Sequence, residues 1–197
     1  MNAFRGATGT GHARLATVCA LSACLGASCA TTEAASAVRS AMRMADGNQW
    51  TTENLNVESE GSYCFGDAAP NCDRYGRLYT WDAAVRVCRT LGSSWRLPTE
   101  SEWRTLAERH GGLFGGTGGG NASLVAGGGA GFDAMRGGNR TAAGLYERLE
   151  AHGFYWTASE TRPSQAWFYN FGRASDRPNR HEDGEKQMAV SVRCIST

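Results

Sequence analysis

Four cysteines carry the clearest chemistry in this chain of 197 residues: Cys64, Cys72, Cys88 and Cys194. An even set of cysteines in an exported chain is typical of disulfides. Three pairings are possible. We favour Cys64 with Cys72, a local link, and Cys88 with Cys194, which would join an early helix to the last strand. A zinc or copper site is the alternative, but no two of these cysteines have the spacing of roughly two to four residues usual in metal sites.

Residues 1–23 have the pattern of an export signal. Two arginines precede a short apolar run that contains no charged residue and cannot span a bilayer. Residues 21–24 read Leu-Ser-Ala-Cys, which resembles the bacterial lipobox, where a peptidase cuts before the cysteine and lipid chains are attached to it. We therefore expect a lipoprotein signal peptide with Cys24 as the lipidated first residue of the mature protein. Leu25 at the next position predicts the outer membrane.

Ordinary signal cleavage after Ser28-Cys29-Ala30 is the second possibility, because small residues suit that site as well. It would give a secreted protein without a lipid anchor. Residues 24–45 are mostly small and include no aromatic residue, which predicts a tether. The role of Cys29 within that tether stays open.

Charge and length limit the remaining possibilities. The formal charge is +1, and losing Arg5 and Arg14 with the signal makes it −1 (+1 − 2). A nearly neutral chain has no electrostatic attraction for nucleic acid, so we expect no nucleic-acid partner. Residues 46–197, about 150 residues, suit one domain with a core of its own.

Two helices are readable from spacing and end signals. After Thr80, apolar residues recur at helical spacing up to Gly92, and Cys88 falls on the apolar face. After Pro98, residues 99–102 read Thr-Glu-Ser-Glu, the pattern of a capping box. A third, short helix is expected over residues 141–152.

Strands are expected over residues 49–55, 153–158, 166–171 and 188–195, the last with Val190, Val192 and Cys194 on one face. Residues 111–131 are more than half glycine. Such a segment buries few side chains, so we expect a long mobile loop. A phosphate-binding loop is not expected, because no strand leads into the glycines and no Gly-Lys-Ser or Gly-Lys-Thr follows.

Several motifs occur together in order: Asp-Gly-Asn-Gln-Trp at 46–50, Tyr-Gly-Arg-Leu-Tyr at 75–79, Trp-Arg-Leu-Pro-Thr-Glu-Ser-Glu-Trp at 95–103, Gly-Phe-Tyr-Trp-Thr-Ala-Ser-Glu at 153–160 and Val-Ser-Val-Arg-Cys at 190–194. Together they resemble the Fibrobacter succinogenes major paralogous domain family. That family is similar in pattern to C-type-lectin-like domains and to formylglycine-generating enzymes. The resemblance implies an α+β, C-type-lectin-like fold with two helices flanking small antiparallel sheets, and with the N- and C-terminal strands paired.

Calcium is a further candidate metal. The Glu-Pro-Asn and Trp-Asn-Asp motifs of sugar-binding C-type lectins do not occur here, so their calcium residues have no counterpart. Oxygen ligands from Asp176, Asn179, Glu182 and Asp183 remain a calcium candidate. A solvated hairpin loop is the competing interpretation, and otherwise no cofactor is expected.

Catalysis finds little support in the residue pattern. The cysteines do not match the reactive pair of formylglycine-generating enzymes, and no serine-histidine-aspartate set or carboxylate pair is readable. Among the aromatic residues, Tyr155, Trp167 and Tyr169 are candidate exposed anchors for a ligand. We therefore expect a noncatalytic, lipid-anchored module of the bacterial cell envelope that binds a glycan or an envelope protein through loops near 111–140 and 172–187. The alternatives are a structural or assembly component of the envelope and an oxidase-type enzyme.

Overall fold

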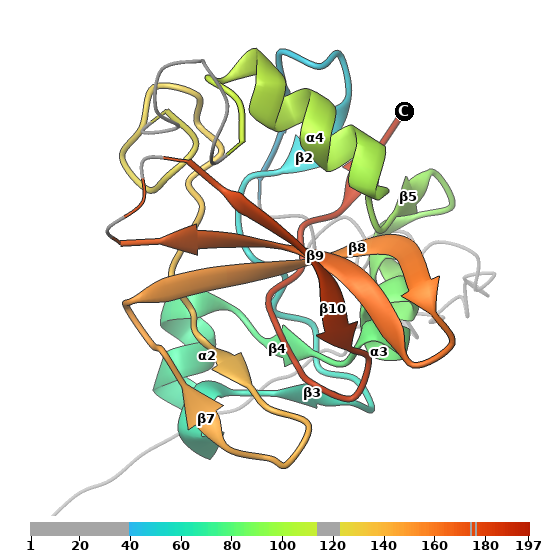
Figure 1. Ribbon diagram of the computed structural model, residues 1–197, viewed down its shortest axis with the longest axis vertical. Coiled ribbons are helices and arrows are strands. Elements are labelled where there is room, and N and C mark those ends of the chain that lie inside the picture. The colour runs from blue at the N-terminus through green and yellow to red at the C-terminus, as the bar shows by residue number, and fades with distance from the viewer. Residues whose placement is uncertain (1–39, 114–122, 174, 176) are drawn as a thin grey trace, which may run out of the picture.

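The computed structural model describes residues 40–113, 123–173, 175 and 177–197 (Figure 1). Cys24, the expected signal and most of the expected tether lie outside them. The described chain is α+β, with short antiparallel sheets and three α-helices. The helices are α2 (Ala69–Tyr75), α3 (Trp81–Val87) and α4 (Glu100–Arg109), with short 3-10 turns η1 (Phe65–Asp67) and η2 (Cys88–Leu91). Within these residues no helix has the length and apolar character needed to cross a membrane.

The two ends of the described chain meet in one sheet of four strands. Its order is β1 (Ala41–Arg43), β2 (Gln49–Thr51), β11 (Ile195–Ser196) and β5 (Trp95–Arg96), and every pairing is antiparallel. The expected pairing of early and late strands is therefore confirmed. Because β1 is part of this sheet, the folded part begins before residue 46, inside the segment expected to be a tether.

A second sheet crosses the middle of the molecule in Figure 1, between α4 and the region of α2 and β7. It has the order β10 (Asn179–Glu185), β9 (Gln165–Gly172) and β8 (His152–Arg162). Successive side chains of a strand point to opposite faces. Phe154 and Trp156 enter one hydrophobic core, whereas Tyr155 between them enters the other. The sheet thus divides the interior into two cores.

Two further sheets have two strands each. In the first, β3 (Ser62–Tyr63) pairs with β4 (Leu78–Tyr79), and in the second, β6 (Asn139–Arg140) pairs with β7 (Tyr146–Glu147). The second forms a hairpin where a short helix was expected, so the helix predicted over residues 141–152 is wrong. Thr141 instead closes the turn, because its hydroxyl accepts a hydrogen bond from the backbone N–H of Leu145 at 3.0 Å.

Both favoured disulfides are present. Cys64 and Cys72 link η1 to α2, and Cys88 and Cys194 link η2 to the segment before β11. The second disulfide lies in the core beside α3. It therefore holds α3 and η2, which we call the helical half, against the last segment of the domain.

Other expectations need correction. The segment 188–195 is not a continuous strand: Val190 and Ser191 form isolated bridges to Tyr79 and Tyr155, and only the final residues join a sheet. The expected mobile loop falls partly on residues 114–122, outside the described ranges. Residues 123–131 are compact turns, and Leu124 among them is fully buried.

Candidate functional site

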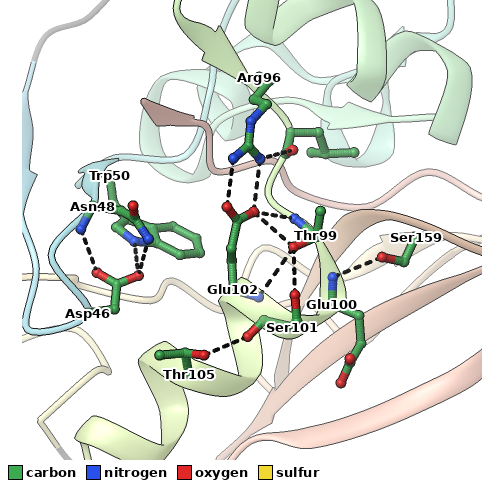
Figure 2. A network of polar contacts seen from close by, with 11 residues as sticks. Asp46, Asn48, Trp50, Arg96, Thr99, Glu100, Ser101, Glu102, Thr105 and Ser159 are labelled. Atoms are coloured by element: carbon green, nitrogen blue, oxygen red, sulfur yellow. Dashed lines mark hydrogen bonds and ion pairs between the residues drawn. The ribbon is translucent and has the colours of Figure 1, made fainter. Parts of the chain in front are cut away.

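The motif at 95–103 stabilises the start of α4. Thr99 caps α4: its hydroxyl accepts from the backbone N–H of Glu102 at 3.3 Å, and the Glu102 carboxylate accepts from the Thr99 N–H at 2.8 Å. The same carboxylate receives two guanidinium N–H groups of Arg96 at 2.8 and 2.6 Å (Figure 2). Burial alone would raise the pKa of Glu102, but these hydrogen bonds outweigh it and lower the pKa to about 2. Glu102 is therefore an ionised structural carboxylate.

The motif at 46–50 has a similar role. The Asp46 carboxylate accepts from the backbone N–H and side-chain amide of Asn48 at 3.1 and 3.0 Å, and from the indole N–H of Trp50 at 2.9 Å (Figure 2). Trp50 is fully buried, and its ring packs edge-on against Trp103 with centroids 5.0 Å apart. The two motifs thus meet in the core beneath α4.

Arg193 carries a buried cation. It is 0% exposed, and its guanidinium donates to Asn54 Oδ1 at 2.8 Å and to the backbone oxygens of Thr51, Phe132 and Asp133 at 3.0, 2.6 and 2.8 Å. Burial lowers its pKa. Since four fixed oxygens already satisfy this group, we interpret it as a structural cross-link between the chain ends and the 132–133 turn.

Two of the three expected aromatic anchors are wrong. Tyr155 and Tyr169 are both 0% exposed because α4 covers that face of the central sheet, and both rings pack against Trp103 at 5.5 and 5.3 Å. Trp167 is half-buried, on the same face of β9 as Tyr169 but nearer the start of the strand. The guanidinium of Arg180 covers it at 4.8 Å and is also paired with Glu100 at 2.8 Å.

The calcium candidates that the structure describes do not converge on one point. Asn179, Glu182 and Asp183 lie along strand β10, so the hairpin-loop interpretation is wrong, and Asp176 falls outside the described residues. No group of three or more histidine, cysteine, aspartate or glutamate side chains is placed to hold a metal within the described ranges. The four domain cysteines are all engaged in disulfides.

A different surface gathers side chains suited to recognition, where the loop closed by the Cys64–Cys72 disulfide meets the β6–β7 hairpin. In Figure 1, β3, α2 and β7 lie together at the opposite end of the molecule from α4. We call this surface the aromatic–arginine patch. It consists of Tyr63, Phe65, Asp67, Arg140, Leu145 and Tyr146.

Stacked groups hold the patch together. The guanidinium of Arg140 lies 4.2 Å from the centre of the Tyr63 ring and 5.8 Å from that of Tyr146. The Phe65 and Tyr146 rings are 5.3 Å apart. The Tyr146 hydroxyl donates to the Asp67 carboxylate. Partial burial, followed by this hydrogen bond, raises the pKa of Tyr146 to about 12, so its hydroxyl stays protonated at neutral pH.

A glycine permits the two loops to meet. Gly138 has φ +69°, and a Cβ there would lie 2.5 Å from the Glu147 carbonyl oxygen and 2.8 Å from the Phe65 ring. Both approaches are shorter than a real carbon atom allows. Only glycine therefore lets the β6 strand come this close to the disulfide loop.

Backbone strain is concentrated around the same surface. Four described residues other than glycine have positive φ, and three of them lie on or beside the patch: Asp67 at 55°, Arg148 at 64° and Glu150 at 60°. Such conformations cost roughly 1–3 kcal/mol each and cluster at functional sites. At Glu150, a hydrogen bond from the Tyr75 hydroxyl at 2.6 Å and an ion pair with Arg74 at 3.1 Å hold the side chain and lower its pKa.

Sequence reasoning missed this patch. Tyr63 and Phe65 flank Cys64, and the expected local disulfide indicated a fixed loop there. Tyr146, however, was assigned to a helix, and no local pattern links it to a residue about eighty positions earlier. The loops named instead, near 111–140 and 172–187, supply only Arg140.

A family model described as the Fibrobacter succinogenes major domain matches residues 31–196, nearly the whole chain after the expected signal. No curated protein and no solved structure matches the chain.

Proposed function

The chain belongs to the Fibrobacter succinogenes major domain family, and from that premise we propose that it is an exported, lipid-anchored, noncatalytic binding module. Its binding surface is the aromatic–arginine patch, and its partner is a protein of the cell envelope. Export is supported by the two disulfides, because such bonds persist in oxidising compartments.

We also propose that the fold is C-type-lectin-like. Three features support it: β2 and β11 are adjacent, a disulfide joins the helical half to the last segment, and α4 opens from the motif at 95–103. Adjacent chain ends suit a domain displayed on a tether, because the binding surface can then face away from the membrane. In Figure 1 the C-terminus lies near α4, whereas the patch lies at the other end.

The observation that carries the binding proposal is the exposed apolar tip of the patch. Leu145 is 63% exposed, and Met42 at 46% is the only other large hydrophobic side chain of the described residues that is exposed. Leu145 directly precedes Tyr146 in the β6–β7 hairpin, and the Tyr146 ring packs against Phe65 in the loop that the Cys64–Cys72 disulfide closes. Tyrosine and arginine are enriched among residues that dominate binding energy at protein interfaces. A fixed surface also loses little conformational entropy on binding.

The ring packing favours a protein over a glycan. A sugar stacks on an open aromatic face, but Arg140 covers the Tyr63 ring and Phe65 packs against Tyr146. What remains available is an apolar tip with ring edges and a guanidinium edge, which matches a mixed apolar and polar protein surface better.

Arrays of envelope proteins and of glycans, probed with the full chain and two matched variants, test the proposal. Leu145→Asp should weaken binding to the protein partner by about tenfold or more, since burying an unpaired charge at an interface is costly. Met42→Gln, a change at the other exposed apolar side chain, should leave binding unchanged. Both variants should melt as the wild type does.

The other outcomes each point elsewhere. Glycan binding that Leu145→Asp abolishes would replace the protein partner by a sugar. Silence on both arrays together with self-association in solution would favour a structural or assembly role. Equal binding by the two variants would remove the patch as the binding surface.

A further inference from the structure

A second feature, separate from the aromatic–arginine patch, is a small hollow between α3, β5 and the start of α4. It is open to solvent, has a volume of about 230 Å³ and is lined by Val85, Arg89, Arg96, Leu97, Thr99 and Ala158. Pockets for drug-sized ligands are larger, about 300–1,000 Å³. The hollow therefore suits a single short aliphatic group.

The apolar part of the hollow is held in a fixed shape. Leu97 is 2% exposed in the core, and the backbone N–H of Ala158 donates to the Pro98 carbonyl at 2.7 Å. On the helical side, η2 is anchored through Cys88 by its disulfide to Cys194. Because β8, β5 and η2 are each fixed, an aliphatic group could enter without rearrangement of the backbone.

The two arginines of the hollow differ in whether a carboxylate neutralises their charge. Arg96 is already neutralised by Glu102, with both contacts at 2.8 Å or less (Figure 2). Arg89 is exposed on η2, and no carboxylate or other hydrogen-bond partner contacts its side chain in the part of the chain that is described. Val85 and Arg89 are four residues apart across the α3–η2 junction, which places the apolar wall and the free guanidinium on the same face.

We propose that this hollow binds an aliphatic group that ends in a carboxylate. The aliphatic part lies against Val85, Leu97 and Ala158, and the carboxylate pairs with the guanidinium of Arg89, a planar fork that matches it. Two sources have this chemistry: the C-terminal residue of a peptide ending in leucine or valine, and a free short-chain acid.

Calorimetric titration of the full chain with four probes tests the proposal and separates the sources. The probes are acetyl-Gly-Gly-Leu, its C-terminal amide, 3-methylbutanoate and 3-methylbutanamide. Each acid should bind about tenfold or more tightly than its amide, the usual scale for a charge-assisted contact. A peptide ligand requires acetyl-Gly-Gly-Leu to bind more tightly than 3-methylbutanoate, and a free acid requires the two to bind alike.

Substitutions in the hollow test which side chains contact the carboxylate and which contact the aliphatic group. Arg89→Gln should weaken both acids about tenfold and leave both amides unchanged, because only the ion pair is lost. Ala158→Leu should weaken all four probes by filling the hollow. The matched control is Arg109→Gln, at an exposed arginine that ends α4, which should bind as the wild type does.

The proposal fails if acid and amide bind equally, if none of the probes binds at millimolar concentration, or if Arg109→Gln weakens binding as much as Arg89→Gln. Melting temperatures and the unreduced disulfide pattern show whether each variant is folded. The result does not depend on the patch, because no residue of the patch lines this hollow.

Discussion

Arg193 concentrates several tertiary contacts in one side chain. Its guanidinium joins the 51–54 segment to the 132–133 turn through four hydrogen bonds. The Cζ atom of the guanidinium also lies 4.6 Å from the centre of the Phe132 ring. Replacement by an apolar side chain of similar length would leave carbonyl oxygens buried without donors.

We predict that Arg193→Met lowers the free energy of unfolding by about 3 kcal/mol, because it leaves buried oxygens without donors and each such group costs roughly 1–3 kcal/mol. Urea denaturation measures it. Arg86→Met, at an exposed arginine of α3, should change the same quantity by no more than about 0.5 kcal/mol. Equal losses in the two variants would mean that the hydrogen bonds of Arg193 contribute nothing measurable.

Glu102 predicts an acid-sensitive step in stability. Its pKa is about 2 in the folded protein, against the ordinary value of 4.5 that we assign to the unfolded chain. A group whose pKa is lower in the folded state stabilises the fold above the unfolded pKa, and this contribution is lost as the pH falls from 4.5 towards 2. Its side chain is 20% exposed but that of its partner Arg96 is 42% exposed, so solvent screening reduces the contribution at neutral pH to on the order of 1–2 kcal/mol.

We therefore expect Glu102→Gln to be less stable than the wild type at pH 7 and to show a flatter loss of stability between pH 4.5 and pH 2. Urea denaturation at a series of pH values measures both effects. Glu108→Gln, at an exposed position of the same helix, should retain the wild-type profile. A wild-type slope in Glu102→Gln would exclude this carboxylate as its source.

At the scale of elements, the two disulfides contribute differently. In the chain-entropy model a cross-link stabilises in proportion to the logarithm of the loop it closes. The sequence separations are 106 for Cys88–Cys194 and 8 for Cys64–Cys72. The long link should therefore contribute about 4–5 kcal/mol and the short one about 2–3 kcal/mol.

Paired alanine substitutions test this order by urea denaturation. Removing Cys88 and Cys194 should destabilise the domain more than removing Cys64 and Cys72. The short link also fixes the loop that carries Tyr63 and Phe65, so its loss should weaken partner binding at the patch while the domain stays folded. Equal destabilisation by the two pairs would contradict the loop-length explanation.

The elements read correctly from sequence are those with local signals. Helix α4 followed from the Thr99–Glu102 capping pattern, and α3 from helical spacing, although Thr80 at its start makes no side-chain capping bond. The disulfide pairs followed from the even number of cysteines in the domain and from their positions along the chain. The helix predictions needed only residues that are close together in the sequence. The disulfide prediction needed a choice among only three possible pairings.

The inferences that failed depended on distant partners. Tyr155 and Tyr169 were expected to be exposed because an isolated strand with large rings on both sides suggests one open face. Here α4 and the last segment cover both faces of the central sheet, so alternation along β8 separates two cores rather than core from solvent. The helix α2 was also missed: its seven residues begin without a capping side chain, and a disulfide holds its middle.

At the scale of the whole molecule, the arrangement of the chain ends connects the fold to its proposed address. The first described residues and the last strand lie in one sheet. A tether that precedes residue 40 would therefore be attached to the domain at the side where the C-terminus lies. A lipid at Cys24 would then hold the domain by one side only. Each buried methylene of an acyl chain contributes about 0.8 kcal/mol to membrane binding, so several chains at Cys24 would anchor the protein without a membrane-spanning helix.

We predict that the mature protein made in a bacterial host begins at Cys24 with acyl chains attached. Mass spectrometry of the N-terminal peptide measures this directly. Cys24→Ala should release the protein from the membrane fraction, because acylation requires the thiol. Cys29→Ala, five residues later in the same tether, should leave both the acyl mass and the fractionation unchanged. An unmodified N-terminus just after Ala30 would instead show ordinary signal cleavage, and the domain would then reach its partner as a diffusible protein rather than a tethered one.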